Sequence, residues 1–261
     1  MKKILFVSVC TMIFAAASAQ APAGKGKTPD KSAKMTPDMT DLWAPIPKII
    51  DPGYSDVVLP TPSDAIILFG KDGKMNEWQQ AENGGPCAWS SEKGVMTVAP
   101  GKGSIVTKRK FNDFQLHIEW RSPTPPTGDS QGRGNSGVFL HGLYEVQVLD
   151  SYNNETYVNG QAGAVYKQSA PLVNPCRKPG EWNTYDIIFT APRFKDDGGV
   201  LYPARVTVIF NGVVVQNNTT ILGPTLNVGV PAYGEAYKGG PLLLQDHKNP
   251  VSYRNIWIRE L

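Results

Sequence analysis

Apolar and polar residues alternate in many short segments of this chain, which is the period of a β-strand. In the segment 114–121 the apolar residues share one parity and the polar residues the other: Phe114, Leu116, Ile118 and Trp120 against Gln115, His117, Glu119 and Arg121. The segment 144–148 repeats this pattern, with Glu145 and Gln147 between apolar residues. One face of each strand can therefore pack a core, while the other holds a ligand or faces water.

Further strand patterns are separated by Gly, Pro, Asn and Asp. They cover residues 65–69, 89–91, 95–98, 104–107, 137–149, 163–166, 183–190, 204–210, 241–245 and 254–259. Asn211 and Gly212 stand between two apolar runs and predict a β-hairpin, because both residues tolerate positive φ. Long helical periodicity is missing. The pattern predicts an all-β fold, a β-sandwich of jelly-roll type with one concave face open to a ligand.

The N-terminal residues 1–19 have the layout of a secretory signal peptide. Lys2 and Lys3 precede an apolar run, which ends in a small-residue motif before Gln20. We expect cleavage after Ala19 and a secreted or periplasmic protein. A lipid anchor at Cys10 is the weaker alternative. No later segment approaches about 20 apolar residues, so no transmembrane segment is predicted.

The rest of the chain divides by composition. Residues 20–41 are rich in Lys, Pro, Thr, Ser and Gly, which predicts a flexible leader. Residues 42–62 carry Trp43 and several prolines, which predicts an extended Pro-rich arm against the domain, able to border a ligand cleft. The domain itself is expected over 63–261, a length suited to one core.

Charge and motifs exclude several functions. The formal net charge is +3 and the Lys and Arg residues are scattered, so nucleic acid is not an expected partner. Nucleotide-binding, metalloprotease, EF-hand and nucleophilic-serine motifs are missing, and no cofactor is predicted. Asp150, Glu155 or Asp246 could bind a divalent cation, but no spacing supports it. Cys87 and Cys176 could pair after export or remain two unpaired thiols.

Polar residues of three segments would converge if their strands were neighbours in one sheet. The shared face would carry two carboxylates, a guanidinium, an imidazole and two amides, contributed by Glu119, Arg121, Glu145, Gln147, Gln245 and His247. Such paired donors and acceptors match sugar hydroxyls. The simpler alternative is a solvated strand face, on which Glu119 and Arg121 form an ion pair contributing about 0–1 kcal/mol.

Six motifs occur in order along the domain. They are GNSG at 134–137, YEVQVLDS at 144–151, GAVY at 163–166, PGEWN at 179–183, LQDH at 244–247 and YRNIWIR at 253–259. Together they resemble the 3-keto-disaccharide hydrolase family over about residues 63–261. The resemblance implies a secreted, concanavalin A-like β-sandwich of Bacteroidetes type that binds carbohydrate and cleaves glycosides previously oxidised at C3.

That substrate class suggests a chemistry. A C3 ketone acidifies the C2 hydrogen, so a base can form an enolate that expels the C1 substituent, and water then adds to the product. An ordinary glycosidase instead places two carboxylates about 5–9.5 Å apart. A conventional glycoside hydrolase and a non-catalytic carbohydrate-binding sandwich remain the alternatives.

The motifs and strand parity together assign hypothetical roles. Glu145 is the expected base, Glu119 the acid or second base, and His247 a proton shuttle. Arg121 and Gln147 are the expected donors to the enolate, and Asn135 and Asp150 are expected to shape the turn or bind sugar hydroxyls. Tyr166 and Trp182 are expected to stack on a pyranose ring. His141 and Gln245 are two further polar residues expected to bind the substrate. His141, beside a glycine in a bend, could alternatively cap backbone groups.

Overall fold

A computed structural model describes residues 34–261, so the predicted signal peptide at 1–19 lies outside the described residues. Helical structure in this part of the chain consists of short 3-10 turns: η1 (Pro37–Thr40), η2 (Ser130–Gly132) and η3 (Val158–Gly160). Over residues 34–261, the structure contains no helix with the length and apolar character needed to cross a membrane. Nearly all other regular structure is β, as predicted.

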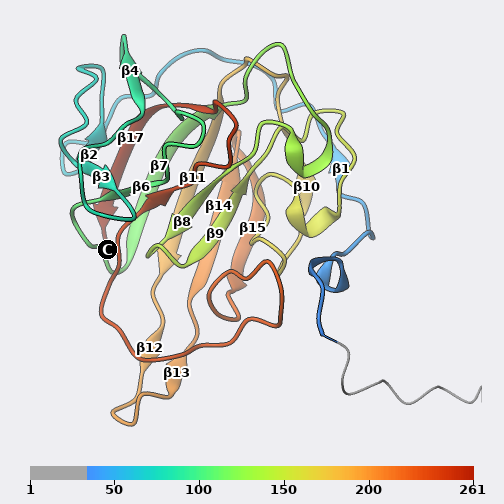
Figure 1. Ribbon diagram of the computed structural model, residues 1–261, viewed down its shortest axis with the longest axis vertical. Coiled ribbons are helices and arrows are strands. Elements are labelled where there is room, and N and C mark those ends of the chain that lie inside the picture. The colour runs from blue at the N-terminus through green and yellow to red at the C-terminus, as the bar shows by residue number, and fades with distance from the viewer. Residues whose placement is uncertain (1–33) are drawn as a thin grey trace, which may run out of the picture. The chain divides into compact units, whose positions relative to one another are not determined.

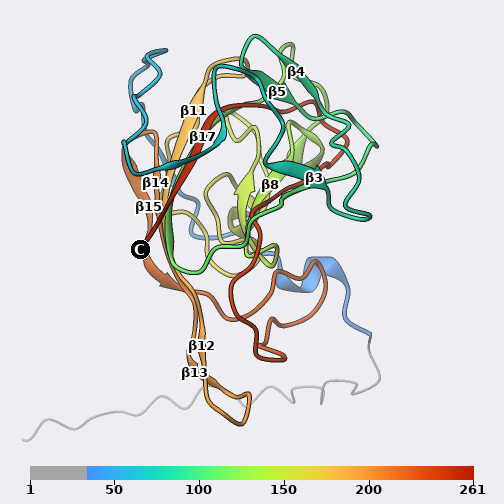
Figure 2. The same cartoon turned by 90° about the vertical axis from the view of Figure 1, so that its left-hand side faces the viewer.

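Two main sheets form the layers of a β-sandwich (Figure 1). The eight-stranded sheet has the order β15 (Val213–Thr220), β14 (Arg205–Phe210), β11 (Asn183–Thr190), β7 (Phe114–Arg121), β17 (Ser252–Glu260), β5 (Val95–Thr97) and β4 (Ser90–Glu92), and β2 (Ile66–Phe69) also pairs with β17. The five-stranded sheet has the order β3 (Trp78–Gln80), β6 (Ile105–Thr107), β16 (Leu243–Leu244), β8 (Ser136–Leu140) and β9 (Tyr144–Val148). Figure 2 shows β8 and β3 in one layer and β11, β14 and β17 in the other. The predicted sandwich is confirmed.

Two small pairs of strands complete the described structure. β1 (Lys48–Ile49) pairs in parallel with β10 (Val173–Asn174), and β12 (Arg193–Phe194) pairs antiparallel with β13 (Val200–Tyr202). The first pair ties the Pro-rich arm to the domain. The second forms a protruding hairpin that Figure 1 shows below the sheets.

The core lies between the inner faces of the two main sheets. The apolar residues of β7 meet those of β8 and β9, and all are buried: Phe114, Leu116, Ile118, Trp120, Val138, Leu140, Tyr144, Val146 and Val148. The Tyr185 hydroxyl on β11 donates to the Gln147 carbonyl on β9 at 2.7 Å and so links the layers. Since successive strand residues point to opposite faces, this core turns Glu145 and Gln147 outward.

The β8–β9 hairpin corrects one predicted strand. Residues 137–149 were expected to form one continuous strand, but the chain reverses at His141 and Gly142, both of which have positive φ. The alternation of apolar and polar residues does not reveal this turn, because the inward residues of both strands have even numbers. Residues 163–166, another predicted strand, form only isolated bridges, from Val165 to Val146 and to Ser169. The hairpin at Asn211-Gly212 is confirmed, with positive φ at both residues.

Residues 34–62, which are the described end of the predicted leader and the Pro-rich arm, form an N-terminal arm that follows the surface of the domain. Residues 34–41, the described end of the predicted leader, include η1 and contact the loop after β9. Further along, the Gly53 carbonyl accepts from Arg177, and the Leu59 carbonyl accepts from Asn255 on β17. Cys87 and Cys176 are both free thiols, so the alternative of a disulfide between them is not realised.

Candidate functional site

A pocket of about 380 Å³ lies on the outer face of the five-stranded sheet. Its lining comes from β8, β9, the segment after β16 and three loops: Gln131, Asn135, Phe139, Glu145, Gln147, Tyr166, Thr225, Asn227, Gln245 and His247. Six of these ten residues were predicted from sequence: Asn135, Glu145, Gln147, Tyr166, Gln245 and His247. The structure therefore brings together residues from four of the six motifs.

Strand register explains why these side chains converge. Gly137 lies opposite Gln147, and the Gln245 amide donates to the Gly137 carbonyl at 3.0 Å, so one row crosses β9, β8 and the segment after β16. Phe139 and Glu145 form the next row. A Cβ at Gly137 would stand 2.5 Å from Glu145 Oε1 and 2.7 Å from the Phe139 ring. The missing side chain at residue 137 thus makes room for the Glu145 carboxyl group.

Glu145 is the most unusual ionisable residue of the pocket. Its side chain is buried, at 5% exposure, and burial raises the pKa of its carboxyl to about 8. Among residues 34–261, no group donates a hydrogen bond to this carboxylate, although the Glu145 amide donates to the Thr225 hydroxyl oxygen at 2.9 Å. A carboxyl with a pKa near neutrality can take or give a proton at physiological pH, which is the requirement for general acid–base catalysis.

Carboxamides surround Glu145 and leave acceptors available. Gln147 Nε2 donates to Gln131 Oε1 at 3.0 Å, and Asn135 Nδ2 donates to the Gln131 carbonyl at 2.7 Å. The Oε1 atoms of Gln147 and Gln245 are buried without a hydrogen-bond partner in the described part of the chain. A buried polar atom left unpaired costs about 1–3 kcal/mol, so a ligand hydroxyl that donates to it gains affinity.

Two further residues border the pocket. Tyr166 donates its backbone amide to the Glu145 carbonyl at 3.1 Å, and its hydroxyl lies 2.6 Å from that of Tyr157. His247 is exposed at the pocket, two residues beyond Gln245. The pocket thus combines a carboxyl group, an imidazole, amides and a tyrosine ring.

Glu119, Arg121 and Trp182 lie elsewhere, which corrects the prediction of one shared face. β7 pairs with β11 and β17 in the eight-stranded sheet, so its polar residues point away from the core on the opposite side of the sandwich. The guanidinium carbons of Arg121 and Arg254 lie 4.6 and 4.2 Å from the Trp182 ring centroid. Trp182 is therefore a partner of arginines rather than part of the Glu145 pocket.

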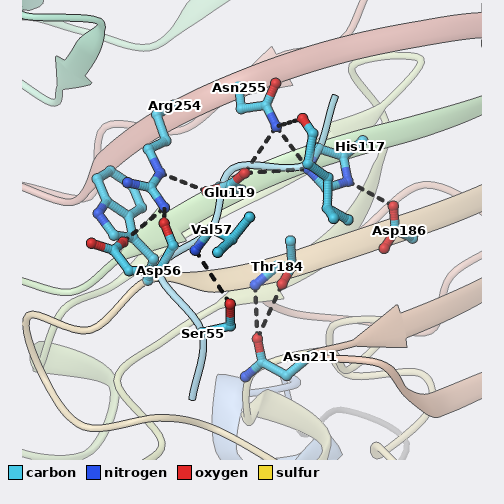
Figure 3. Close-up of polar contacts among 12 residues, drawn as sticks. Ser55, Asp56, Val57, His117, Glu119, Thr184, Asp186, Asn211, Arg254 and Asn255 are labelled. Carbon is cyan, nitrogen blue, oxygen red and sulfur yellow. Dashed lines mark hydrogen bonds and ion pairs between the residues drawn. The ribbon is translucent and has the colours of Figure 1, made fainter. Parts of the chain in front are cut away.

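Glu119 belongs to a buried ionic network (Figure 3). It accepts from Arg254 Nε at 2.6 Å and from Asn255 Nδ2 at 2.9 Å, and its Oε1 lies 3.5 Å from His117 Nε2. Desolvation opposes ionisation of Glu119, but these contacts outweigh it and lower the pKa of the carboxyl. A carboxylate held ionised by three partners supports the fold and is poorly suited to exchange protons with a substrate.

His141 and Asp150 also lie outside the pocket. His141 lies in the turn after β8, and its Nε2 is 2.9 Å from the Asn112 carbonyl oxygen. This contact with a backbone group agrees with the alternative that His141 caps the backbone. Asp150 is fully buried, with Oδ2 2.9 Å from Arg133 Nε and Oδ1 accepting from the Tyr152 amide. Burial raises the pKa of the Asp150 carboxyl, which Arg133 partly offsets. Asp150 shapes the turn beside the pocket.

Four pocket residues were missed by the sequence reasoning. Phe139 has the parity of Glu145 and could have been found once the hairpin was recognised. Gln131 lies in the short turn η2, and Thr225 and Asn227 lie in a loop, and in neither place does a periodic signal mark the direction of a side chain. Within residues 34–261, no group of three His, Cys, Asp or Glu side chains is arranged to hold a metal ion.

A larger cavity, of about 740 Å³, lies between the β12–β13 hairpin and the segment before β16. Lysines and three aromatic rings dominate its lining, including Lys110, Phe194 and Tyr237. Its carboxylates, Asp196 and Glu260, are exposed to water. Because no buried carboxyl faces this cavity, the smaller Glu145 pocket is the better candidate for acid–base chemistry.

Comparisons with known proteins identify the family of this chain. Residues 64–259 match the family described as the 3-keto-alpha-glucoside-1,2-lyase-like domain. The crystal structure of a candidate glycosyl hydrolase from Parabacteroides distasonis ATCC 8503 is 55% identical, with a TM-score of 0.75, over 87% of this chain and 97% of the other.

Two other candidate glycosyl hydrolases from that organism are 22% and 21% identical, with TM-scores of 0.54 and 0.50. They cover 76% of this chain in each case and 94% and 99% of their own, and they share the fold. No curated protein is significantly similar to this chain. Since the family match spans most of the sequence, the chain belongs to the 3-keto-alpha-glucoside-1,2-lyase-like domain family.

Proposed function

We propose that this protein cleaves glycosides whose sugar ring carries a ketone at C3, with Glu145 as the base. The observation that carries the proposal is the buried Glu145 carboxyl, which has a pKa of about 8 and faces a pocket lined by amides. Family membership supports a carbohydrate-cleaving enzyme. A ketone at C3 makes the C2 hydrogen acidic enough for a single carboxylate to remove it.

In the proposed first step the Glu145 carboxylate takes the proton from C2. The electron pair of the C2–H bond forms the C2–C3 double bond of an enolate, and the C3 oxygen gains the negative charge. We assign the binding of the enolate oxygen to the Gln245 carboxamide, which lines the pocket, in place of Arg121, which lies on the other sheet.

In the second step the enolate re-forms the C3 ketone and expels the C1 oxygen substituent. A proton is needed on the departing oxygen, and we assign its donation to His247, the imidazole in the lining of the pocket. The product is a sugar with a C1–C2 double bond conjugated to the ketone. Addition of water across this bond, with OH joining C1 and H joining C2, gives net hydrolysis.

The test compares a 3-keto-glucoside with the same glucoside left unoxidised. We expect aglycone release only from the keto substrate, and deuterium incorporation at C2 when the reaction runs in heavy water. Equal cleavage of both substrates would sink the ketone-based mechanism. Sugar binding without product from either substrate would instead support a binding module.

The same assay tests the base. Glu145→Gln should fold normally and lose about 10²- to 10⁴-fold in kcat, the range expected on removing a general base. Glu92→Gln is the matched control, because Glu92 is exposed on β4 in the other sheet and should keep full activity. A Glu145→Gln variant with ordinary turnover would eliminate Glu145 as the base.

We also propose that the protein is exported, on the basis of the signal-peptide pattern at 1–19. Expression of the full sequence with its own N-terminus should give a mature protein that begins at Gln20. N-terminal sequencing of the exported product checks this. A mature chain that retains Met1 would overturn it.

A further inference from the structure

The segment that precedes the domain is bound to the loop after β9 by backbone hydrogen bonds. Asn159, fully buried in η3, accepts from the Leu42 amide at 2.9 Å and donates to the Thr40 carbonyl at 2.9 Å. The Val158 amide donates to the Leu42 carbonyl at 2.6 Å. Residues 40–42 are thus held at both their donor and acceptor groups, which fixes the position of the next residue, Trp43.

Lys167 joins this segment to the walls of the Glu145 pocket. Its side chain is 5% exposed, and its Nζ donates to the Pro37 carbonyl at 2.5 Å and the Asn227 carbonyl at 3.1 Å. The same ammonium lies 3.0 Å from Asp41 Oδ1. Lys167 directly follows Tyr166, and both Tyr166 and Asn227 line the pocket. The N-terminal segment is therefore bound beside the loops that carry Tyr166 and Asn227 into the pocket.

Aromatic rings lead from the pocket to this segment. Tyr166 lines the pocket, and its ring centroid lies 6.2 Å from that of Tyr157, edge to face. The Trp43 centroid lies 6.3 Å from that of Tyr157, again edge to face. Tyr157 is 9% exposed, whereas Trp43 is 59% exposed. The row begins at the Glu145 pocket and ends in an indole that is more than half exposed.

An exposed indole that is fixed in place by its neighbours is unusual, because large aromatic side chains normally bury most of their surface. Its flat apolar face suits the axial C–H groups of a pyranose, while the sugar hydroxyls remain in water. Backbone bonds at residues 40–42 reduce the ordering that a ligand would otherwise have to impose on Trp43.

We propose that Trp43 is an outer sugar-binding subsite, on which a second or third ring of the substrate stacks while the keto sugar occupies the Glu145 pocket. The proposal rests on the proposed function for the identity of the inner sugar. It assigns to the Pro-rich arm a role in the selection of longer glycosides. Lys167 and Asn159 act as positioning residues that hold the arm beside the pocket.

The test measures KM and kcat for Trp43→Ala with a methyl 3-keto-glucoside and with a 3-keto-trisaccharide. We expect the KM for the trisaccharide to rise between about two- and tenfold, the loss of one stacking contact, while the methyl glycoside is unaffected. Trp43→Phe should recover part of the affinity. Tyr202→Ala, which removes another exposed ring at β13, is the matched control and should change neither substrate.

Two outcomes overturn the subsite. Unchanged kinetics for both substrates would show that Trp43 does not touch sugar, and equal losses for both would show that Trp43 supports the pocket itself. Failure of the proposed function is separable, because it would appear as no turnover by the unaltered enzyme. In that case calorimetry with the unoxidised trisaccharide still tests the subsite: weaker binding by Trp43→Ala supports it, and equal binding overturns it.

Discussion

Glu145 owes its chemistry to what the sequence places around it. Odd-numbered positions of β8 and β9 face outward, and those beside Glu145 carry a glycine, a phenylalanine and a glutamine in place of a cation. Without a charged partner nearby, desolvation alone sets the pKa of the Glu145 carboxyl near 8. Glu119 shows the opposite case, because Arg254, Asn255 and His117 keep its carboxyl ionised. Two carboxylates with the same strand parity thus differ in proton affinity through their neighbours.

The raised pKa of Glu145 gives a pH prediction. A base must be ionised, so kcat/KM should rise with pH, about tenfold per unit well below pH 8, and level off above it. Initial rates on a 3-keto-glucoside between pH 5 and 10 measure the midpoint. In His247→Gln this limb should keep its midpoint, because it belongs to Glu145. In that variant, which lacks the proposed acid, activity that falls as the pH passes 8 would make Glu145 the acid instead.

Strand parity found much of the pocket but could not assign strands to sheets. It correctly gave outward directions to Glu145, Gln147 and Gln245, because alternation follows from backbone geometry alone. It failed for Glu119 and Arg121 because a sandwich has two outer faces, and nothing in a local pattern tells on which one a strand lies. Thr225 and Asn227 were beyond reach, since long-range contacts position the loop that carries them.

The hairpin of β8 and β9 is the element on which the pocket depends. Its three-residue turn preserves parity, so both strands present odd residues to the same side, and the segment directly after β16 adds Gln245 to the row. Gly137, in the centre of the row, has no side chain, and the Glu145 carboxyl occupies the space that a side chain there would need. Strand pairing can therefore build the floor of the pocket only if residue 137 has no side chain.

Gly137→Ala should consequently impair activity without preventing folding. Gly137 has an ordinary strand conformation, but the added methyl would displace the Glu145 carboxyl or the Phe139 ring. A misplacement of about 1 Å can cost about 10²-fold in rate, and we expect a loss of kcat/KM of about that size. Steady-state kinetics measure it, with circular dichroism as the check on folding.

The control for this substitution is Gly234→Ala. Gly234 also lacks a positive φ, and a Cβ there meets no atom within 4 Å, so this variant should match the unaltered enzyme. Full activity of Gly137→Ala would show that the Glu145 carboxyl does not need its present position.

Across the whole domain, the N-terminal arm connects the two outer faces of the sandwich. Near η1 it contacts Lys167 beside the Glu145 pocket, and at Asp56 and Leu59 it contacts Arg254 and Asn255 over the ionic network of the eight-stranded sheet. Composition predicted an extended arm, yet neither face that it covers was readable from the sequence. The partners of the arm are brought together only by the completed fold.

His117 lies at the centre of that network and links stability to pH. Its side chain is fully buried and stacks on Trp257, with ring centroids 5.1 Å apart. Burial opposes protonation, but Asp186 at 2.7 Å and Glu119 at 3.5 Å outweigh it and raise the pKa of His117 to about 9, from 6.5. The folded state therefore holds the proton of His117 more tightly than the unfolded chain does.

The sign of the effect follows from this difference. Because the folded pKa is the higher one, the stabilisation is complete below pH 6.5, declines above it and is lost once the pH has passed 9. Its full size is on the order of 3 kcal/mol. Urea unfolding at pH 6, 8 and 10 measures the free energy of unfolding, which should fall with pH in the unaltered protein. It should fall less in His117→Gln, because that variant lacks the titrating imidazole but keeps every other ionisable group. If that variant does not fold, NMR titration of the His117 ring in the unaltered protein decides: a midpoint near 9 supports the network, and one at or below 6.5 contradicts it.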